Sequence, residues 1–397
     1  MLNELKKICN ELYVKLLVII ILVVSVVMTA FVVTSSFEES VSAESDVYLK
    51  GKEGIKLSKK RYEKTTGDLT ADKLNETLKY YQSISNDTEA FNQSYTIYPG
   101  VFNLLLSAYA PTLDSESDLR LLNNADDFYN QNEIQIKKNI SNGSEKYNSW
   151  EEPVVLRKAK SIHKPYKIAF HEQWKLLFPT IMVVSMAIGF SSVLISSRLF
   201  SFEKEKHMDL VLATIGGKKL RKVGRNKLSA LLIFLSVEYV LSMLIVAILY
   251  FPVTGVTGWS SQIQTQFFTS PYHLTFGESY LLALFMGWIS TMAIGMLVSA
   301  FNAFSQNSLV SLLLGVIAVF VPVVMKNLDF SAKVKKFFLM QPVQGFFPEN
   351  AFRSLHAYKI GPVYCLTSTV IIFYGLIILI LGAAVIPEIF RIRVKSE

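Results

Sequence analysis

Residues 200–227 read FSFEKEKHMDLVLATIGGKKLRKVGRNK and lie between two long apolar runs, so they join two predicted membrane spans. The first half predicts a short helix, because Glu203 and Glu205 stand in its opening turn, where the helix dipole favours acids. An apolar stripe follows over residues 208–215, and Gly216-Gly217 is a typical helix end. The second half has six cations and no acid in ten residues, which indicates a cytoplasmic loop.

The helix in this loop is more than an orientation signal requires. A few cations are enough to fix the topology, whereas this loop adds a capped helix with an apolar stripe that must pack on something. We therefore predict a docking element for a cytoplasmic partner. A helix that lies on the lipid headgroups is the alternative.

The composition of the whole chain predicts a membrane protein. Of 397 residues, 51% are hydrophobic, and many of them stand in runs that approach the roughly 20 residues needed to cross a bilayer. The net charge of +8 does not indicate nucleic-acid binding, because residues 198–227 alone hold nine cations against three acids, 9 − 3 = +6. Cys9 and Cys365 are expected on opposite sides of the membrane, which excludes a disulfide between them.

The apolar runs predict an α-helical polytopic protein with six transmembrane helices and both termini in the cytoplasm. The predicted spans are residues 16–35, 176–197, 228–252, 279–300, 309–325 and 363–386. The segments on the cytoplasmic side are an amphipathic helix at 1–15, the loop at 198–227 and the tail at 387–397. The segments expected outside are the large domain at 36–175, the loop at 253–278 and the segment 326–362.

Two of these assignments have alternatives at the N-terminus. Residues 1–15 place apolar side chains at helical spacing between lysines, which predicts a helix along the inner membrane surface, with an ordinary charged flank as the alternative. A secretory signal peptide competes for the first span, since Val41-Ser42-Ala43 resembles a cleavage site. The apolar run is longer than such peptides need, so we predict a retained anchor.

The domain at 36–175 is polar, contains no spanning run and is expected to be mainly helical, with an α+β fold possible. Its aromatic residues are sufficient to form a core. Helices are predicted at 71–83, 102–110 and 117–129. The domain ends in a basic stretch, residues 157–175, which predicts a solvated or headgroup-facing surface or, alternatively, a route for an anionic substrate.

Two features inside the predicted spans stand out. Glu238 lies near the middle of the third span, where a carboxylate is costly and faces a partner or a wet cavity. A structural hydrogen bond, contact with a transported substrate and a proton-linked step all remain open for it. Small residues recur every fourth position along the fourth span, which predicts a groove for another helix; the alternative is their general abundance in spans. The groove residues are Ala283, Gly287, Thr291, Gly295 and Ser299.

Residues 326–362 are too apolar for a free loop and too interrupted by Pro342, Gly345 and Pro348 for a span. We expect this segment to dip into the outer leaflet. Lysines at 333, 335 and 336 count against its outer placement under the charge rule.

Catalytic motifs are missing from the sequence. There is no phosphate-binding loop, because Gly216-Gly217-Lys218-Lys219 has neither the spacing nor the following Ser or Thr. The five histidines are scattered, and His171-Glu172 lacks the second ligand of a zinc helix. We therefore predict no enzymatic activity, no catalytic residue, no metal site and no cofactor in this chain.

The stretch FEKEKHMDLVLAT, with the basic run and GRNKL after it, resembles the loop between the second and third spans of ABC type-2 exporter permeases. That motif covers about 25 residues, whereas the resemblance in plan covers the whole chain: an N-terminal helix, six spans and a broken outer segment before the last. The long domain after the first span departs from the common pattern and prevents an easy assignment of the substrate.

The resemblance implies the membrane half of an ATP-driven exporter in a bacterial plasma membrane, moving a peptide, an antibiotic or a lipid-like substrate. It implies a separate ATP-binding-cassette ATPase that binds ATP and Mg, and a second permease subunit, identical or not. Membrane lipid is the remaining partner, and no nucleic acid is expected. The coupling helix implied by the resemblance contains Glu203, Glu205, Asp209, Leu210 and Leu212.

A sensor or immunity protein is the competing hypothesis. Its external domain would bind a peptide or antibiotic and signal inward without transport. Association with an ATPase would separate the two possibilities.

Overall fold

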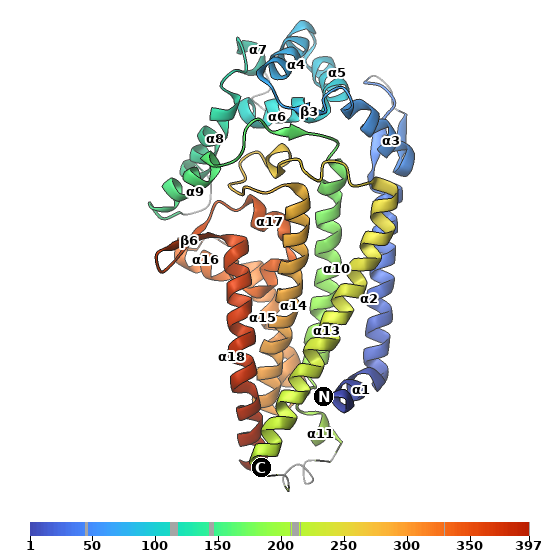
Figure 1. The fold of residues 1–397 in the computed structure, drawn as a ribbon, viewed down its shortest axis with the longest axis vertical. Coiled ribbons are helices and arrows are strands. Elements are labelled where there is room, and N and C mark those ends of the chain that lie inside the picture. The colour runs from blue at the N-terminus through green and yellow to red at the C-terminus, as the bar shows by residue number, and fades with distance from the viewer. Residues whose placement is uncertain are drawn as a thin grey trace.

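The computed structural model describes residues 1–43, 47–111, 118–142, 147–206, 208, 214, 216–328 and 330–396. Within these ranges, six helices are long and apolar enough to cross a membrane. They form an elongated bundle, and a smaller, mainly helical domain covers one end of it (Figure 1). We call residues 36–175 the head domain. Both termini lie at the opposite end of the bundle, which we call the basal end (Figure 1).

All six long helices extend beyond the predicted apolar runs at one end or at both. The six are α2 (Leu12–Phe31), α10 (Glu172–Ser196), α13 (Gly217–Thr254), α14 (Phe276–Ser305), α15 (Ser308–Met325) and α18 (Thr367–Ser396). The π-helical turn η1 (Val32–Ser36) prolongs α2 into the head domain. A Thr275–Glu278 capping box starts α14 three residues before the predicted span.

The basic half of the central loop is helical, which corrects the prediction. Gly216 has an extended backbone and forms the N-cap of α13, and the helix runs from Gly217 without interruption into the third span. Lys and Arg are good helix formers, so the cationic run continues the helix. The predicted boundary at residue 228 is the start of the apolar run, whereas the helix itself begins at Gly217.

The last span was also placed too early. Residues 363–366 are strand β6 (Val363–Leu366), which pairs antiparallel with β5 (Ala357–Ile360). Gly361, with φ 59°, lies in the tight turn between the two strands, a conformation that favours glycine. The helix α18 begins only at Thr367 and continues to Ser396, so the predicted tail is helical.

The head domain consists of short helices and two small antiparallel sheets. Its helices are α3 (Gly51–Tyr62), α4 (Ala71–Ser83), α5 (Asp87–Ile97), α6 (Pro99–Tyr109), α7 (Asp118–Leu121), α8 (Phe128–Asn142) and α9 (Glu151–Lys160). Its strands are β1 (Glu38–Ser40) with β2 (Tyr48–Lys50), and β3 (Gly67–Asp68) with β4 (Lys167–Ile168). The helix predicted at 71–83 is present. The one predicted at 117–129 is wrong, because residues 122–127 separate α7 from α8.

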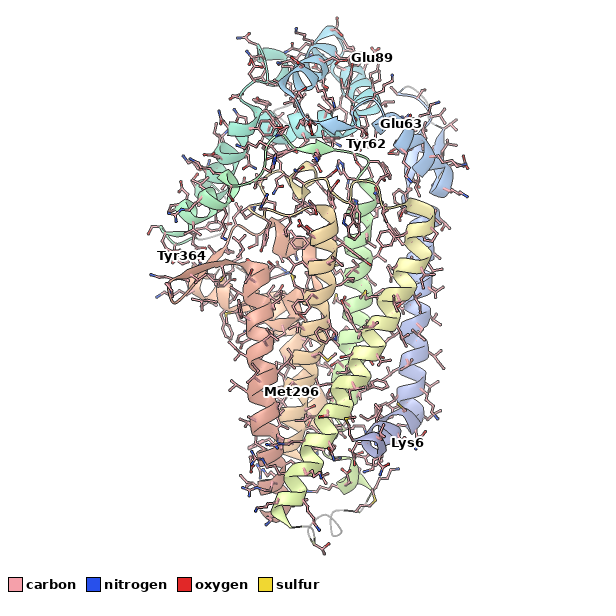
Figure 2. All side chains as sticks on the ribbon, in the orientation of Figure 1. Lys6, Tyr62, Glu63, Glu89, Met296 and Tyr364 are labelled. Atoms are coloured by element: carbon pink, nitrogen blue, oxygen red, sulfur yellow. The ribbon has the colours of Figure 1, made fainter. Side chains whose placement is uncertain are left out.

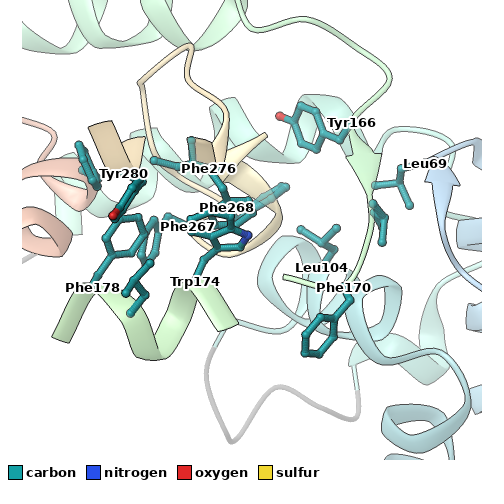
Figure 3. Close-up of a cluster of buried hydrophobic side chains, with 14 of the residues drawn as sticks. Leu69, Leu104, Tyr166, Phe170, Trp174, Phe178, Phe267, Phe268, Phe276 and Tyr280 are labelled. Atoms are coloured by element: carbon teal, nitrogen blue, oxygen red, sulfur yellow. The ribbon is translucent and has the colours of Figure 1, made fainter. Parts of the chain in front are cut away.

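One continuous hydrophobic core joins the head domain to the bundle (Figure 3). Trp174 in the first turn of α10 is fully buried and stacks on Phe276 of α14, with ring centroids 5.9 Å apart. Phe268, from the connection between α13 and α14, packs on Phe128 of α8 at 5.3 Å. The head domain is therefore packed on the bundle and is not attached by linkers alone.

The segment before the last span enters the bundle over a short length. It contains α16 (Ala332–Leu339), the 3-10 turn η4 (Pro342–Phe346) and α17 (Pro348–Arg353). Phe346 is 1% exposed and packs against Gly189 of α10, while Gly345 packs closely against Ser290 of α14. The segment is thus a set of short turns inserted among long helices.

The short helix α1 (Leu2–Asn10) packs on the basal end, and Ile8 is its buried residue.

Candidate functional site

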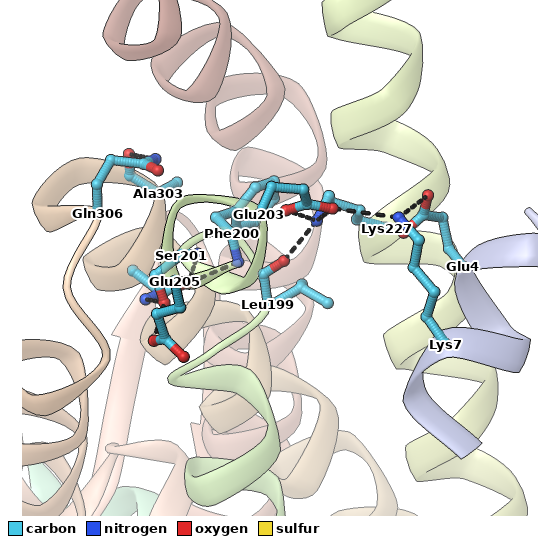
Figure 4. Close-up of polar contacts among 11 residues, drawn as sticks. Glu4, Lys7, Leu199, Phe200, Ser201, Glu203, Glu205, Lys227, Ala303 and Gln306 are labelled. Atoms are coloured by element: carbon cyan, nitrogen blue, oxygen red, sulfur yellow. Dashed lines mark hydrogen bonds and ion pairs between the residues drawn. The ribbon is translucent and has the colours of Figure 1, made fainter. Parts of the chain in front are cut away.

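The basal end holds a buried ion pair that joins the α10–α13 connection to α13 (Figure 4). Glu203 belongs to α11 (Phe202–Glu205), the short helix that follows α10. Its two carboxylate oxygens each accept a hydrogen bond from Lys227 Nζ at 2.6 Å. The side chains of Lys227 and Glu203 are 2% and 5% exposed. Lys227 also donates to the Leu199 carbonyl at 2.8 Å, so it holds this turn at two points.

The N-terminal helix α1 supplies a second cation to Glu203. Lys7 Nζ lies 3.2 Å from Glu203 Oε1 and also 3.2 Å from Glu4 Oε1. Burial alone would lower the pKa of Lys7, but the two carboxylates raise it above its usual value. The positive charge on Lys7 is therefore stabilised where α1 meets the bundle. We call Lys7, Glu203 and Lys227 the basal triad.

Asn302, near the end of α14, fixes the same turn from the other side. Its side-chain oxygen accepts hydrogen bonds from the Phe200 and Ser201 backbone N–H groups at 2.6 and 3.0 Å. Its amide donates to Ser201 Oγ and to Ser311 Oγ of α15, both at 3.1 Å. Buried backbone N–H groups require a partner, so Asn302 determines where this turn can lie.

The remaining contacts of the turn are an aromatic contact and an ion pair. Phe200 is 1% exposed and packs on Phe390 of α18, with ring centroids 4.9 Å apart. Arg198 pairs with Glu205 at 2.7 Å and lies over the Tyr13 ring of α2 at 5.0 Å. Residues 198–205 therefore contact α1, α2, α13, α14 and α18 together. A displacement of this turn would disturb contacts with all five helices.

The basal part of α13 lies along α18. Arg221 Nε is 2.6 Å from Glu388 Oε1, and Glu388 also pairs with Arg391 at 2.8 Å. A Cβ on Gly224 would lie 3.1 Å from Pro387 Cα, so the two helices approach closely at this point. Lys218, Lys219, Lys222 and Arg225 remain exposed on α13. The basal end therefore presents a cationic surface.

No family model, curated protein or solved structure matches this chain.

The predicted coupling residues differ in their burial, and three of them lie outside the described residues. It buries Glu203 in the basal triad, so this carboxylate is held inside the protein and is not a surface group for a partner. Glu205 is partly exposed, with 31% of its side chain accessible, although it pairs with Arg198. Asp209, Leu210 and Leu212 lie outside the described residues.

Sequence reasoning missed Asn302 and the role of Lys227. The sequence groups Lys227 with the other cations of the loop, but its side chain is buried, whereas several of the others are exposed. The available signal was its position, the last cation before the apolar run. Asn302 lies two residues beyond the predicted fourth span, as a polar residue between apolar and small ones, and that contrast could have identified it.

The five groove residues of α14 all lie on its buried face. The groove receives α10 and α13. A Cβ on Gly287 would lie 2.3 Å from Tyr239 Oη, and one on Gly295 would lie 2.8 Å from both Leu235 Cδ1 and Ser192 Oγ. Ser192 Oγ also donates to the Thr291 carbonyl at 3.1 Å. The small side chains thus allow three spans to approach one another.

Glu238 lies between α13 and α10 and is 4% exposed. Ser191 Oγ of α10 is 3.0 Å from Oε1 and 3.2 Å from Oε2 of this carboxylate. This contact supplies the structural hydrogen bond considered for Glu238. The roles in substrate contact and proton transfer stay predictions.

A second buried ion pair joins the head domain to the segment before α18. Glu151 of α9 is fully buried, and Lys336 of α16 lies 2.8 Å from its Oε1. The Ala357 N–H donates to Glu151 Oε2 at 3.1 Å, and His356 Nδ1 lies 3.3 Å from the same oxygen. Burial alone would raise the pKa of Glu151, but hydrogen bonds from His356, Lys336 and the Asn148 backbone lower it to about 2.

We expect Glu151→Gln to loosen this connection, because it leaves the Lys336 ammonium buried without its carboxylate. Hydrogen exchange over residues 147–160 and 355–366 should increase. Since the pKa of Glu151 is depressed to about 2 in the folded protein, its contribution is complete above the ordinary pKa near 4.5 and is lost as the pH falls from about 4.5 to 2.

Glu152→Gln is the matched control, since it removes a neighbouring carboxylate that is partly exposed. It should leave exchange in both segments unchanged. Equal exchange in the Glu151→Gln variant and the wild-type protein would contradict the proposed connection.

Metal sites have no candidate among the described residues. In those ranges, no group of three or more His, Cys, Asp or Glu side chains could hold a metal ion.

Proposed function

We propose that this chain is the membrane-spanning subunit of an ATP-driven exporter. The observation that carries the proposal is the turn at residues 198–205, through which one short segment contacts five helices at the basal end. A subunit that takes force from a separate motor needs such a point of contact. The resemblance of residues 202–228 to the corresponding loop of ABC type-2 permeases supports the same conclusion.

The proposed orientation places the basal end in the cytoplasm and the head domain outside. The basal ends of α13 and α18 concentrate Lys and Arg, as expected for the inner side of a bacterial plasma membrane. Those cations are Lys218, Lys219, Arg221, Lys222, Arg225, Arg391, Arg393 and Lys395. An ATPase that docks at this end would meet the cationic surface and the connection between α10 and α13.

The length of α13 suggests how force could reach the membrane. At 1.5 Å per residue, its 38 residues extend roughly 57 Å, almost twice a hydrocarbon core of about 30 Å. A push on the α10–α13 connection would therefore act on the end of one continuous helix. The basal triad would carry the same push to α1. ATP and Mg would be bound by the ATPase, and a second permease subunit would complete the transporter.

We expect Leu212→Asp to abolish stimulation of the ATPase by this chain without preventing membrane insertion. Leu212 belongs to the apolar stripe of the connection, and a buried aspartate at the docking surface would oppose association. The measurement starts with a tagged chain purified from its native membrane with any associated ATPase. ATP hydrolysis is then compared in proteoliposomes that contain the wild-type or the variant chain.

Leu121→Asp is the control, because Leu121 is 82% exposed and belongs to α7, a helix of the head domain that lies far from the basal end (Figure 1). It introduces the same charge and should leave stimulation unchanged. Full stimulation by the Leu212→Asp variant would argue against docking through this segment. Glu203→Lys is unsuitable here, since it would break the basal triad whatever the partner.

A membrane receptor that binds a ligand without transport is the second candidate. A large polar cleft in the head domain favours it. Purification of a stable, ligand-binding protein that never associates with an ATPase would support this candidate over the exporter.

A further inference from the structure

The head domain contains an open cleft of about 760 Å³ between the β1–β2 hairpin and α5. Glu89, which lines it, lies on α5 at the far end of the head domain (Figure 2). A second hollow of about 440 Å³ shares Arg61, Gln93 and Thr96 with the first. Ligand sites commonly have volumes of about 300–1,000 Å³, so the cleft is large enough for several amino-acid residues.

The one guanidinium in the cleft wall is already engaged. Arg61 Nη1 donates to Glu39 Oε2 at 2.6 Å, and Nη2 donates to the Ser40 carbonyl at 2.5 Å. Only 12% of the Arg61 side chain is exposed. Arg61 therefore holds α3 to β1 and has little capacity left to attract an anionic ligand.

Two further carboxylates, those of Glu89 and Glu38, line the cleft and are less fully neutralised by cations than Glu39 is. Glu89 accepts a hydrogen bond from the Gln93 amide at 2.9 Å and has no cationic partner among the described residues. Glu38 pairs with Lys50, which does not line the cleft, and both side chains are about half exposed, so a bound cation can replace Lys50 in this weak surface pair. With Arg61 and Glu39 neutralising each other, the lining has an excess of negative charge.

Aromatic rings and neutral polar groups complete the lining. Phe91 and Tyr95 lie nearly parallel, with centroids 6.3 Å apart and planes at 16°. Burial, with the charges of Glu172 and Glu39, raises the pKa of Tyr95 to about 12, so its hydroxyl remains neutral. Tyr48 of β2 is 55% exposed. Aromatic faces attract ammonium and guanidinium groups and also cover apolar stems.

We propose that this cleft binds a short cationic peptide. Glu89 and Glu38 would pair with its ammonium or guanidinium groups, and the aromatic rings would contact its side-chain stems. Thr88 and the Asn92 amide also line the cleft and can donate hydrogen bonds to peptide carbonyls. A polyamine carries the same charge without carbonyls, so it would leave these donors unused.

The position of the cleft gives binding a mechanical consequence. Its β1 wall follows α2 directly through η1 and the buried residue Phe37. Its α3 wall ends at Tyr62, whose hydroxyl donates to Glu172 at the start of α10 at 2.9 Å. A peptide that bridges β1 and α5 would therefore act on the ends of two spans. Binding itself does not depend on the proposed ATPase.

The test uses the full-length chain in detergent micelles and isothermal titration calorimetry. The probe is the acetylated tripeptide amide Lys-Trp-Lys, and the comparison peptides are Glu-Trp-Glu and Gln-Trp-Gln. We expect the cationic peptide to bind and the other two not to bind, and its affinity to fall as salt is raised. Glu89→Gln should weaken binding about tenfold, and Glu38→Gln/Glu89→Gln further.

The control variant Glu53→Gln removes an exposed carboxylate of α3 that does not line the cleft, and it should bind like the wild-type protein. Three results would overturn the proposal: no binding of the cationic peptide at millimolar concentration, unchanged affinity in the double variant, or equal binding of Glu-Trp-Glu. Spermine that binds as tightly as the peptide would overturn the assignment to peptides.

Discussion

We expect Lys227→Met to destabilise the protein by about 3–5 kcal/mol, the range for removing one member of a buried ion pair. The substitution preserves most of the apolar stem of Lys227. It leaves the Glu203 carboxylate 5% exposed and without its closest cation, because the Lys7 ammonium is farther away and 42% exposed. The Leu199 carbonyl also loses its 2.8 Å hydrogen bond. Unfolding of the purified chain in mixed micelles would measure the loss of stability.

The double variant Glu203→Gln/Lys227→Met shows whether the loss of stability comes from the unpaired Glu203 carboxylate or from a general packing defect. A double variant in which neither charge remains should be more stable than Lys227→Met alone, because no carboxylate is left buried without its partner. Lys7→Met should cost about 1 kcal/mol or less, since the Lys7 side chain is 42% exposed and solvent screens its ion pairs. A Lys227→Met variant that unfolds at the same denaturant concentration as the wild-type protein would refute the account of the basal triad.

The six long helices could be predicted because hydrophobicity is a property of continuous runs of sequence. Their ends could not. The apolar pattern of the third span begins near residue 228, but α13 begins at Gly217, since lysines and arginines extend a helix without being apolar. In the last span, the strand residues 363–366 (VYCL) are apolar and lead directly into the helix after them, so hydropathy alone placed the start too early.

The candidate site was harder to predict, because its contacts join distant positions. Glu203 and Lys227 are 24 residues apart, and Asn302 is 102 residues from Phe200, whose N–H group it binds. No local pattern encodes such distances. The sequence identified the segment as important through its charge and apolar stripe, but it gave no sign that Glu203 is buried against Lys227.

The groove on α14 shows what the spacing of small residues can and cannot predict. Small residues at every fourth position predict the close approach of another helix, and the five residues of this repeat in fact lie on the buried face of α14. The pattern contains no information on which helices enter. The structure supplies Tyr239 from α13 and Ser185 from α10, both of which would contact a Cβ on Gly287.

We expect Gly287→Leu to prevent normal packing of the bundle. Even the first added atom, Cβ, would lie 2.3 Å from Tyr239 Oη and 3.2 Å from Ser185 Oγ, and leucine adds three more carbons. Tyr239 is 3% exposed and donates its hydroxyl hydrogen bond to the Leu284 carbonyl at 2.9 Å, so its ring has little space to move. Overpacking of this kind typically costs about 1–3 kcal/mol and can exceed that range. Yield of monodisperse protein and its thermal midpoint are the measurements.

Gly216→Leu is the matched control, because a Cβ on Gly216 meets no atom within 4 Å. It should be tolerated far better than Gly287→Leu.

The milder variant Gly287→Ala tests the mechanism, since the closest obstacle is the Tyr239 hydroxyl. Adding Tyr239→Phe removes that oxygen and leaves the ring carbon Cζ, 3.1 Å from the Cβ position, as the nearest Tyr239 atom. The double variant should therefore recover part of the lost stability. A Gly287→Leu protein with wild-type yield and thermal midpoint would show that α10, α13 and α14 do not approach one another through this groove.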